Sequence, residues 1–152
     1  IARFGQFALA SRDLDELLHR AVELVTEVLG TELCKVLELL PDGKALRLRA
    51  GVGWREGLVG QATVGADKDS QAGYTLLSDQ AVVAEDLRTE TRFRGPPLLH
   101  EHGVVSGMSV VIRGPNRAFG VLGTHTTGRR SFGEHAVNFL TAIANVSAAA
   151  IE

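Results

Sequence analysis

The sequence predicts an α+β domain built on an antiparallel sheet. Two pairs of apolar segments are each joined by a short turn, which favours antiparallel neighbours because a tight turn cannot make a parallel connection. An amphipathic helix precedes the first pair, and an Ala-rich helix follows the second. We expect a sheet of five to six strands, with the N- and C-terminal helices on one face and an irregular crossover over the other.

The bulk composition is that of one globular domain of ordinary size. Its 152 residues are 45% hydrophobic and 22% charged, enough to bury a core. A net charge of −2 excludes the basic surface on which nucleic-acid binding normally depends. No apolar run approaches the ~18 residues that span a bilayer, so we expect no direct membrane contact. A single cysteine, Cys34, fits a reducing compartment, which predicts a cytoplasmic location.

The chain is expected to be one domain over residues 1–152, excised from a longer multidomain protein, since it starts without Met and both ends are helical in pattern. Apolar residues three and four apart predict the end of an entering linker helix within residues 1–12, leaving 13–152 as the core. Asp13 with Glu16 predicts a capping box at the start of the first core helix. Its apolar spacing continues until a C-terminal glycine at position 30.

The next segment predicts a β-hairpin. Residues 33–40 and 45–50 flank a Pro-Asp-Gly turn, and an Asp-Gly pair between apolar runs supplies the positive φ that such a turn requires. The first strand is apolar on both faces apart from Lys35 and Glu38, which predicts a central position. The second strand alternates apolar residues with arginines, so we expect it at an edge of the sheet with one solvated face.

Residues 51–80 predict an irregular crossover, because glycines interrupt every longer element except a helical turn or two within residues 69–77. A short strand at 81–84 and a short helix at 97–102 are expected to follow. A crossover draped over a sheet face is where ligand pockets form. We therefore expect the binding pocket between this segment and the sheet.

A second hairpin and a long helix close the chain. Strands over residues 104–112 and 118–126 turn at Gly114-Pro115-Asn116, and Ser131 with Glu134 predicts a second capping box.

The last helix bears two adjacent apolar stripes that span roughly half its circumference, more than packing on one sheet needs. One interpretation is a well-buried helix. The other is that one stripe packs on the sheet while the second meets a partner helix, which makes Val146, Ala150 and Ile151 a homodimer interface.

Several short segments, in this order, are typical of one signalling family. They are Asp15-Glu16-Leu17-Leu18, Ala84-Glu85-Asp86-Leu87-Arg88, Val104-Val105-Ser106-Gly107-Met108-Ser109-Val110 and Phe119-Gly120-Val121-Leu122-Gly123. From about Leu14 to Glu152 the chain resembles the GAF domains of bacterial sensor histidine kinases and related signalling proteins, a fold related to PAS domains. The resemblance implies a non-catalytic sensory module. Such a module binds a small ligand of unknown identity and signals through its terminal helices to a covalently attached output domain.

The candidate ligand-binding residues lie on the crossover side of this expected fold. They are Trp54, Tyr74, Leu98, His100, Ser109, Val111 and His125. The two aromatic residues are interpreted as pocket walls or as lids on the core. A structural dimerisation module with an empty pocket is the alternative to a ligand sensor.

Other members of the family bind cyclic nucleotides, bilins or haem, or use catalytic thiols, and each of these functions requires particular residues. The Asn-Lys pair of cyclic-nucleotide-binding members is missing, and a lone Cys34 on a predicted central strand fits neither bilin attachment nor a thiol mechanism that needs a resolving cysteine. No catalytic residue is predicted, and no cofactor is required. Haem-sensing members take an axial histidine from the segment before residue 104, so His100, His102 and His125 are the candidates if haem or another metal is bound. The other interpretation is that His100 and His102 are solvated residues of a short polar helix.

Overall fold

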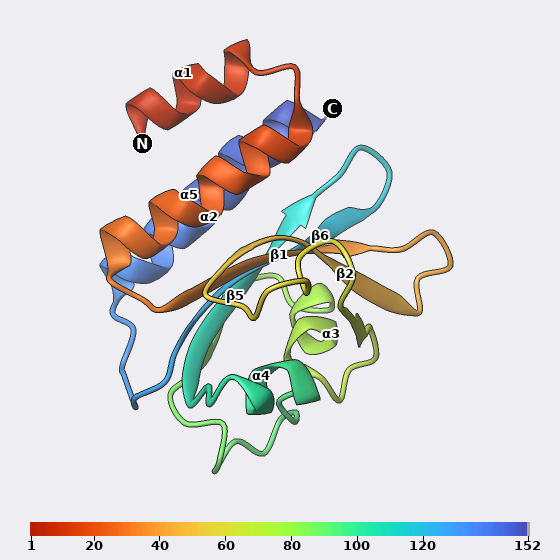
Figure 1. The fold of residues 1–152 in the computed structure, drawn as a ribbon, viewed down its shortest axis with the longest axis vertical. Coiled ribbons are helices and arrows are strands. Elements are labelled where there is room, and N and C mark those ends of the chain that lie inside the picture. The colour runs from red at the N-terminus through yellow and green to blue at the C-terminus, as the bar shows by residue number, and fades with distance from the viewer. Residues whose placement is uncertain (152) are drawn as a thin grey trace.

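The computed structural model describes residues 1–151 and contains one six-stranded sheet with helices on both faces (Figure 1). In chain order the elements are α1 (Ala2–Ala10), α2 (Leu14–Leu29), β1 (Leu33–Leu39), β2 (Ala45–Val52), β3 (Thr63–Gly65), α3 (Gln71–Leu76), β4 (Val82–Ala84), α4 (Pro97–Glu101), β5 (Ser106–Arg113), β6 (Ala118–Thr126) and α5 (Glu134–Ile151). The strand order is β3-β2-β1-β6-β5-β4, and all neighbours are antiparallel. The predicted α+β fold is confirmed.

Helices α2 and α5 lie side by side on one face of the sheet, and α1 packs outside them (Figure 1). Asp13 Oδ1 accepts hydrogen bonds from the backbone N–H groups of Asp15 and Glu16 at 3.0 and 3.3 Å, so the predicted N-cap of α2 is confirmed. Gly30 ends α2 with a left-handed φ of 66°, which only glycine adopts without strain. No helix within residues 1–151 is both long and apolar enough to span a membrane.

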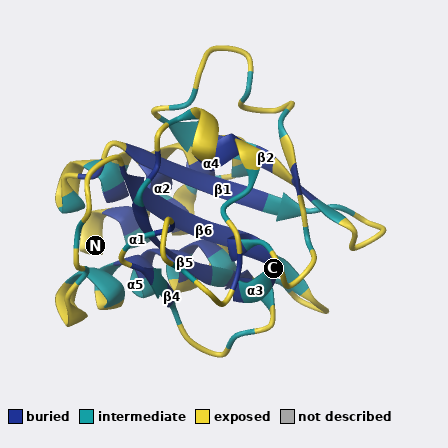
Figure 2. Ribbon diagram, turned by 90° about the horizontal axis from the view of Figure 1, so that it is seen from below, coloured by how far each residue is buried: buried dark blue, intermediate teal, exposed yellow. Residues whose placement is uncertain are grey.

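The other face of the sheet is covered by the crossover, which includes β3, α3, β4 and α4. Two apolar groups lie beneath it, one around Leu33 and Leu99 and the other around Leu37 and Leu48. Figure 2 shows the consequence for the sheet, because β1, β5 and β6 are buried along most of their length. The central position predicted for residues 33–40 is confirmed.

The prediction that residues 45–50 form an edge strand is wrong. β3 pairs outside β2, with Leu46 opposite Val64. The predicted alternation is confirmed, since Leu46, Leu48 and Ala50 are buried while Arg47 is exposed and Arg49 half-buried. A β-bulge nevertheless places Ala50 opposite Val36 and Leu48 opposite Leu37. The bulge turns the Leu48 side toward the crossover and the Ala50 side toward the helices, so the alternating apolar residues serve both cores.

The predicted capping box at the start of α5 is also wrong. The Ser131 hydroxyl donates to Glu85 Oε1 at 2.8 Å instead of capping the helix. The first turn of α5 begins with a bond from the Val137 N–H to the Gly133 carbonyl at 3.1 Å. Because the Ser131 hydroxyl is bonded to a carboxylate of another loop, it cannot also cap α5. This competition arises from tertiary structure.

Candidate functional site

Five buried polar side chains lie between the sheet and the crossover, and we call them the polar cluster. They are Lys35 of β1, Ser109 of β5, His125 of β6, and Gln71 and Thr75 of α3. None is more than 2% exposed. Burying polar groups costs free energy unless they are hydrogen-bonded, so their concentration at one place in an otherwise apolar core marks a candidate site.

Gly123 explains how the sheet side of the polar cluster comes together. In the register of the sheet, Lys35 and Ser109 both pair with Gly123, from opposite sides. A Cβ built on Gly123 would lie 3.3 Å from Lys35 Cε, 3.3 Å from His125 Nε2 and 3.5 Å from Ser109 Cβ. These three side chains therefore converge over a position that has no side chain. Gly107 is equally necessary, because a Cβ there would overlap the His125 ring.

The hydrogen bonds of the polar cluster are incomplete. The Thr75 hydroxyl donates to the Gln71 carbonyl at 2.7 Å and lies 2.6 Å from the Ser109 hydroxyl, which therefore donates to it. Within residues 1–151, both ring nitrogens of His125 and both side-chain polar atoms of Gln71 are buried without a hydrogen-bond partner. No carboxylate in that range lies within 4.0 Å of the Lys35 ammonium. The polar cluster therefore contains a lysine without a carboxylate partner, together with hydrogen-bond donors and acceptors that have no partner.

Burial sets the protonation of these groups. It lowers the pKa of Lys35 to about 7, because a poorly solvated surrounding disfavours the ammonium. Burial lowers the pKa of His125 well below its ordinary value, and the positive charge of Lys35 lowers it further. At neutral pH the imidazole is therefore neutral, with one donor and one acceptor nitrogen, while Lys35 is close to its midpoint.

Trp54 covers the polar cluster from the crossover side. Its indole N–H donates to the Cys34 carbonyl at 2.9 Å, which fixes the ring against β1. The ring centroid lies 5.9 Å from Lys35 Nζ, within cation–π range when the amine is charged. The ring also meets His125 and His102 edge-on, with centroids 6.3 and 4.9 Å away. An aromatic wall thus adjoins the buried cation.

Comparison with known proteins identifies the fold. The model of the GAF domain family matches residues 13–151. The chain belongs to the GAF domain family. GAF domains are in general sensory and regulatory modules. A comparison with curated proteins gives no match.

Solved GAF-like structures superpose on nearly the whole chain. The GAF domain of a phosphoenolpyruvate-protein phosphotransferase from Coxiella burnetii has 19% identity and a TM-score of 0.86, covering 99% of this chain and 89% of that one. A methyl-accepting chemotaxis protein has 21% identity and a TM-score of 0.82, with 97% and 94% covered. Free methionine-R-sulfoxide reductase from Neisseria meningitidis has 14% identity and a TM-score of 0.82, with 99% and 84% covered. At such identities the likeness shows the fold alone, on which both sensors and an enzyme occur.

Most predicted ligand-binding residues of this GAF domain face the crossover. Ser109 and His125 belong to the polar cluster, and Trp54 covers it. Leu98 is buried in the apolar group around Leu37, and Val111 is half-buried on β5, two residues beyond Ser109 on the same face. Ser109, Val111 and His125 thus lie on the sheet, and Trp54 and Leu98 belong to the crossover that covers it.

Two further candidates lie away from the polar cluster. Tyr74 is half-buried and packs on Phe93, with ring centroids 5.3 Å apart. The guanidinium of Arg92 lies 5.7 Å from the centroid of the Tyr74 ring. Tyr74 therefore packs against other residues of the crossover. His100 is exposed on α4.

The three histidines proposed for haem or metal are not gathered at one point. His100 is exposed, whereas His125 is fully buried. Both ring nitrogens of His102 are engaged, since Nδ1 lies 2.8 Å from the Leu98 carbonyl and Nε2 accepts from the Arg55 N–H at 3.0 Å. Across residues 1–151, no group of three or more His, Cys, Asp or Glu side chains is arranged to hold a metal ion.

Three members of the polar cluster were not predicted as site residues: Lys35, Gln71 and Thr75. Of the three, Lys35 could have been predicted from the sequence. A lysine in a strand that is otherwise apolar on both faces is expected to be buried together with its neighbours. Gln71 and Thr75 gave no such indication, since a short polar helix in an irregular crossover is normally solvated.

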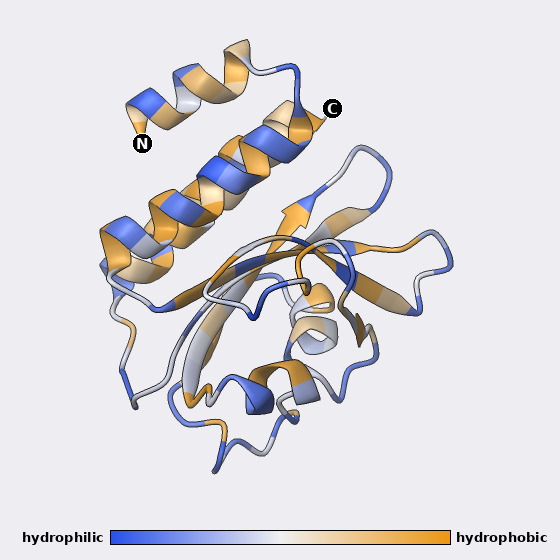
Figure 3. Cartoon of the chain, viewed as in Figure 1, coloured by the Kyte–Doolittle hydropathy of each residue, from blue (hydrophilic) through white to orange (hydrophobic). Residues whose placement is uncertain are grey.

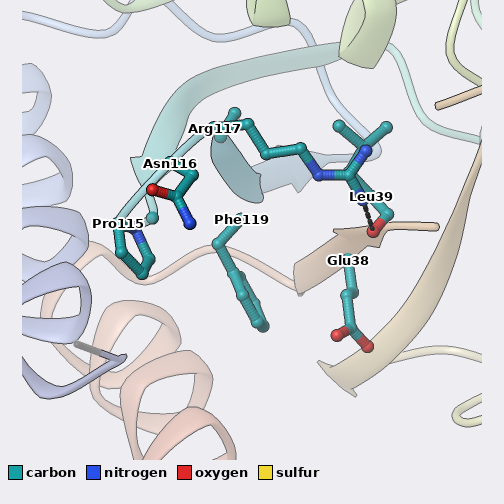
Figure 4. A pocket seen from close by; sticks show the side chains of 8 residues that line it. Glu38, Leu39, Pro115, Asn116, Arg117 and Phe119 are labelled. Carbon is teal, nitrogen blue, oxygen red and sulfur yellow. Dashed lines mark hydrogen bonds between the residues drawn. The ribbon is translucent and has the colours of Figure 1, made fainter. Parts of the chain in front are cut away.

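A separate surface groove of about 420 Å³ lies where the tips of the two hairpins meet (Figure 4). Arg117 donates to the carbonyls of Leu39 and Leu40, at 3.3 and 2.9 Å. Figure 4 shows this guanidinium reaching from one hairpin to Leu39 on the other. The groove is best explained as the joint between two hairpins, because its main polar group already binds backbone carbonyls.

Proposed function

We propose that this GAF domain is the non-catalytic sensory module of a signal-transduction protein, such as a bacterial sensor histidine kinase, in the cytoplasm. A small ligand binds at the polar cluster, and the terminal helices pass the change to a covalently attached output domain. The observation that supports this function most is the set of buried donors and acceptors without a protein partner on His125 and Gln71. Each such group costs about 1–3 kcal/mol, so a ligand that pairs with them has a source of affinity.

The strands themselves supply a route from ligand to helices. Lys35 and Ser109 face the crossover, while their neighbours Cys34 and Met108 are buried against α2 and α5. A ligand that shifts β1 or β5 by a fraction of an ångström therefore alters the surface on which the terminal helices pack. Close-packed cores respond to such shifts by switching between discrete arrangements.

The state of the only thiol supports a non-catalytic role. Cys34 is fully buried on the helix side of β1, and burial raises the pKa of its thiol to about 12. Thiol catalysis requires an accessible thiolate, which this position does not provide.

The terminal helices provide a surface for a second copy. On α5 the buried residues are Leu140, Ile143, Ala144 and Ser147. Val146 and Ile151 are half-buried because they pack partly against the core, and Ala150 is exposed, so each keeps surface that a second copy could cover. Figure 3 shows hydrophobic residues on the parts of α5 that are visible behind α2 and at its C-terminal end. A groove of about 450 Å³ beside it is lined by Gly5, Ala8, Leu9, Ser11, Val146, Ala149 and Ala150.

Ligand binding is tested by measuring thermal unfolding of the domain against a panel of small metabolites, followed by calorimetric titration of each compound that stabilises it. A ligand at one hundred times its Kd adds about 2.7 kcal/mol to the free energy of unfolding. His125→Phe should abolish that stabilisation, whereas His100→Phe, on the exposed side of α4, should retain it. A domain that dimerises but is stabilised by no compound would instead be a structural dimerisation module.

The homodimer is tested separately by light scattering. Val146→Glu should give a folded monomer, and Asn145→Glu, at the exposed neighbouring position, should leave the dimer intact. A Val146→Glu protein that remains a dimer, or a wild-type protein that is monomeric throughout, contradicts the proposed interface.

A further inference from the structure

We infer that the ligand of the polar cluster is a small organic anion, a carboxylate that also bears a neutral hydroxyl or carbonyl group, with Lys35 as its counter-charge. This inference rests on the proposed function, because it names the class of ligand for the same site. The lysines of the chain differ in their exposure to solvent. Of the three in the sequence, Lys44 and Lys68 are exposed, and Lys35 alone is buried.

No carboxylate within residues 1–151 pairs with the Lys35 ammonium, which has the face of the Trp54 ring beside it. The nearest segments of the crossover do contain carboxylates, but Asp67, Asp69 and Glu101 are all exposed. A buried cation is normally paired, because its isolation costs several kcal/mol. A ligand carboxylate is the group that would pair Lys35 and reverse this cost.

The other groups of the polar cluster determine what else the ligand carries. The neutral imidazole of His125 offers one donor and one acceptor, and the Gln71 amide offers two donors and one acceptor. These groups match a hydroxyl or a carbonyl on the ligand. An ammonium group does not fit, because it would add a second cation beside Lys35 without a carboxylate partner. The site should therefore prefer 2-hydroxy and 2-oxo acids to amino acids of the same size.

The segment that covers the polar cluster, which we call the roof, contains Trp54 and the two short helices α3 and α4. α3 has six residues and α4 has five, and both are joined by irregular segments. Such short elements belong to the less stable part of a fold. Trp54 is only half-buried, so its ring lies between solvent and the polar cluster. A ligand that displaces this roof places its carboxylate next to Lys35 and within reach of the aromatic face.

Pairing with an anion has a protonation signature. Burial lowers the Lys35 pKa to about 7 in the free protein, and a bound carboxylate raises it again. Binding above pH 7 therefore takes up a proton, and affinity falls as pH rises from 7. The titratable groups that interact electrostatically with Lys35 are His125 on β6 and Cys34, its neighbour on β1. His125 stays neutral across this range because its pKa is lowered.

The test is calorimetric titration of the whole domain with glycolate, lactate, glycerate, pyruvate, malate and 2-oxoglutarate. Each probe is compared with its neutral amide, and lactate is also compared with alanine. We expect at least one acid to bind, its amide to bind at least tenfold more weakly, and alanine to bind more weakly than lactate. Titrations in PIPES and in Tris at pH 8 should give different heats of binding, because the buffer releases the proton that the complex takes up. The heat should be more endothermic in Tris, whose heat of ionisation is larger.

Variants assign the binding to Lys35. Lys35→Met should lower the affinity for the acid at least tenfold and remove the proton uptake, whereas Lys44→Met makes the same change at an exposed position and should do neither. If Lys35→Met does not fold, the proton uptake of the wild-type protein decides. Full affinity in Lys35→Met, equal binding of acid and amide, or binding without proton uptake each overturns the inference.

Failure of this inference is distinguishable from failure of the proposed function. If none of the acids binds but an uncharged or cationic compound of the general panel does, the domain is a sensor for another ligand class. If no compound of either set binds, both proposals fall.

Discussion

Replacing Lys35 by methionine should make the domain more stable at neutral pH and flatten the dependence of its stability on pH. Methionine has a similar length and no charge, so it fills the space beneath Trp54 without the cost of a buried amine. In the wild-type chain, burial lowers the Lys35 pKa from 10.5 to about 7. Over the whole range this difference corresponds to about 5 kcal/mol of stability.

The direction of the change in stability with pH depends on whether the folded or the unfolded chain binds the Lys35 proton more tightly. The unfolded chain holds the Lys35 proton up to its ordinary pKa of 10.5, whereas the folded chain releases it near pH 7. The penalty is therefore complete below pH 7 and disappears as pH rises toward 10.5. From pH 7 to pH 9 the wild-type domain should gain about 2 kcal/mol relative to Lys35→Met.

The assay is urea unfolding of both proteins at pH 7, 8 and 9, which gives the difference in free energy of unfolding at each pH. The Cys34 thiol also has a pKa changed by burial, but it is present in both proteins and largely cancels in the difference. Lys44→Met should follow the wild-type profile, because that lysine is exposed. Parallel profiles for wild type and Lys35→Met would show that Lys35 is solvated in the folded protein and that the polar cluster holds no buried amine.

Four other perturbations test the structure. Asp13→Ala removes the N-cap of α2 and should lower the free energy of unfolding by about 1 kcal/mol in urea titrations; no loss would contradict the cap. Ile143→Ala, at a fully buried site, should cost about 2–5 kcal/mol by the same assay, and a cost below 1 would place this residue outside the core. Gly107→Ala should cost about 1–3 kcal/mol, because the added methyl overlaps His125, and an NMR shift of that ring would report its displacement. Cys34 should react with a thiol reagent only after urea unfolding, so rapid labelling of the native protein would be inconsistent with its burial.

The features that the sequence predicted correctly depend on short-range chemistry. The cap at Asp13 and the end of α2 at Gly30 each involve a few neighbouring residues. The turn at Gly43 has a φ of 73°, as an Asp-Gly turn requires. The central position of β1 followed from a strand apolar on both faces, which only a sheet covered on both sides tolerates.

The errors came from contacts between distant segments. β3 has three residues, too few for any periodicity, so nothing local showed that it would pair outside β2. Ser131 has the right chemistry for an N-cap, yet its hydroxyl bonds to Glu85, which is 46 positions away. Trp54, Ser109 and His125 were predicted as site residues because the crossover was expected above them, but their arrangement around Gly123 depends on the register of three strands.

The sequence by itself determined the order of helices and strands, the turns between them and the family to which this domain belongs, because periodicity, caps and glycines act within a few residues of one another. Only the tertiary structure decided which polar residues are buried together. Lys35 has the same side chain as Lys44, and its pKa is lowered to about 7 only because β6, α3 and Trp54 exclude water from it. Desolvation is a property of all the surrounding atoms, so no local pattern of residues could specify it.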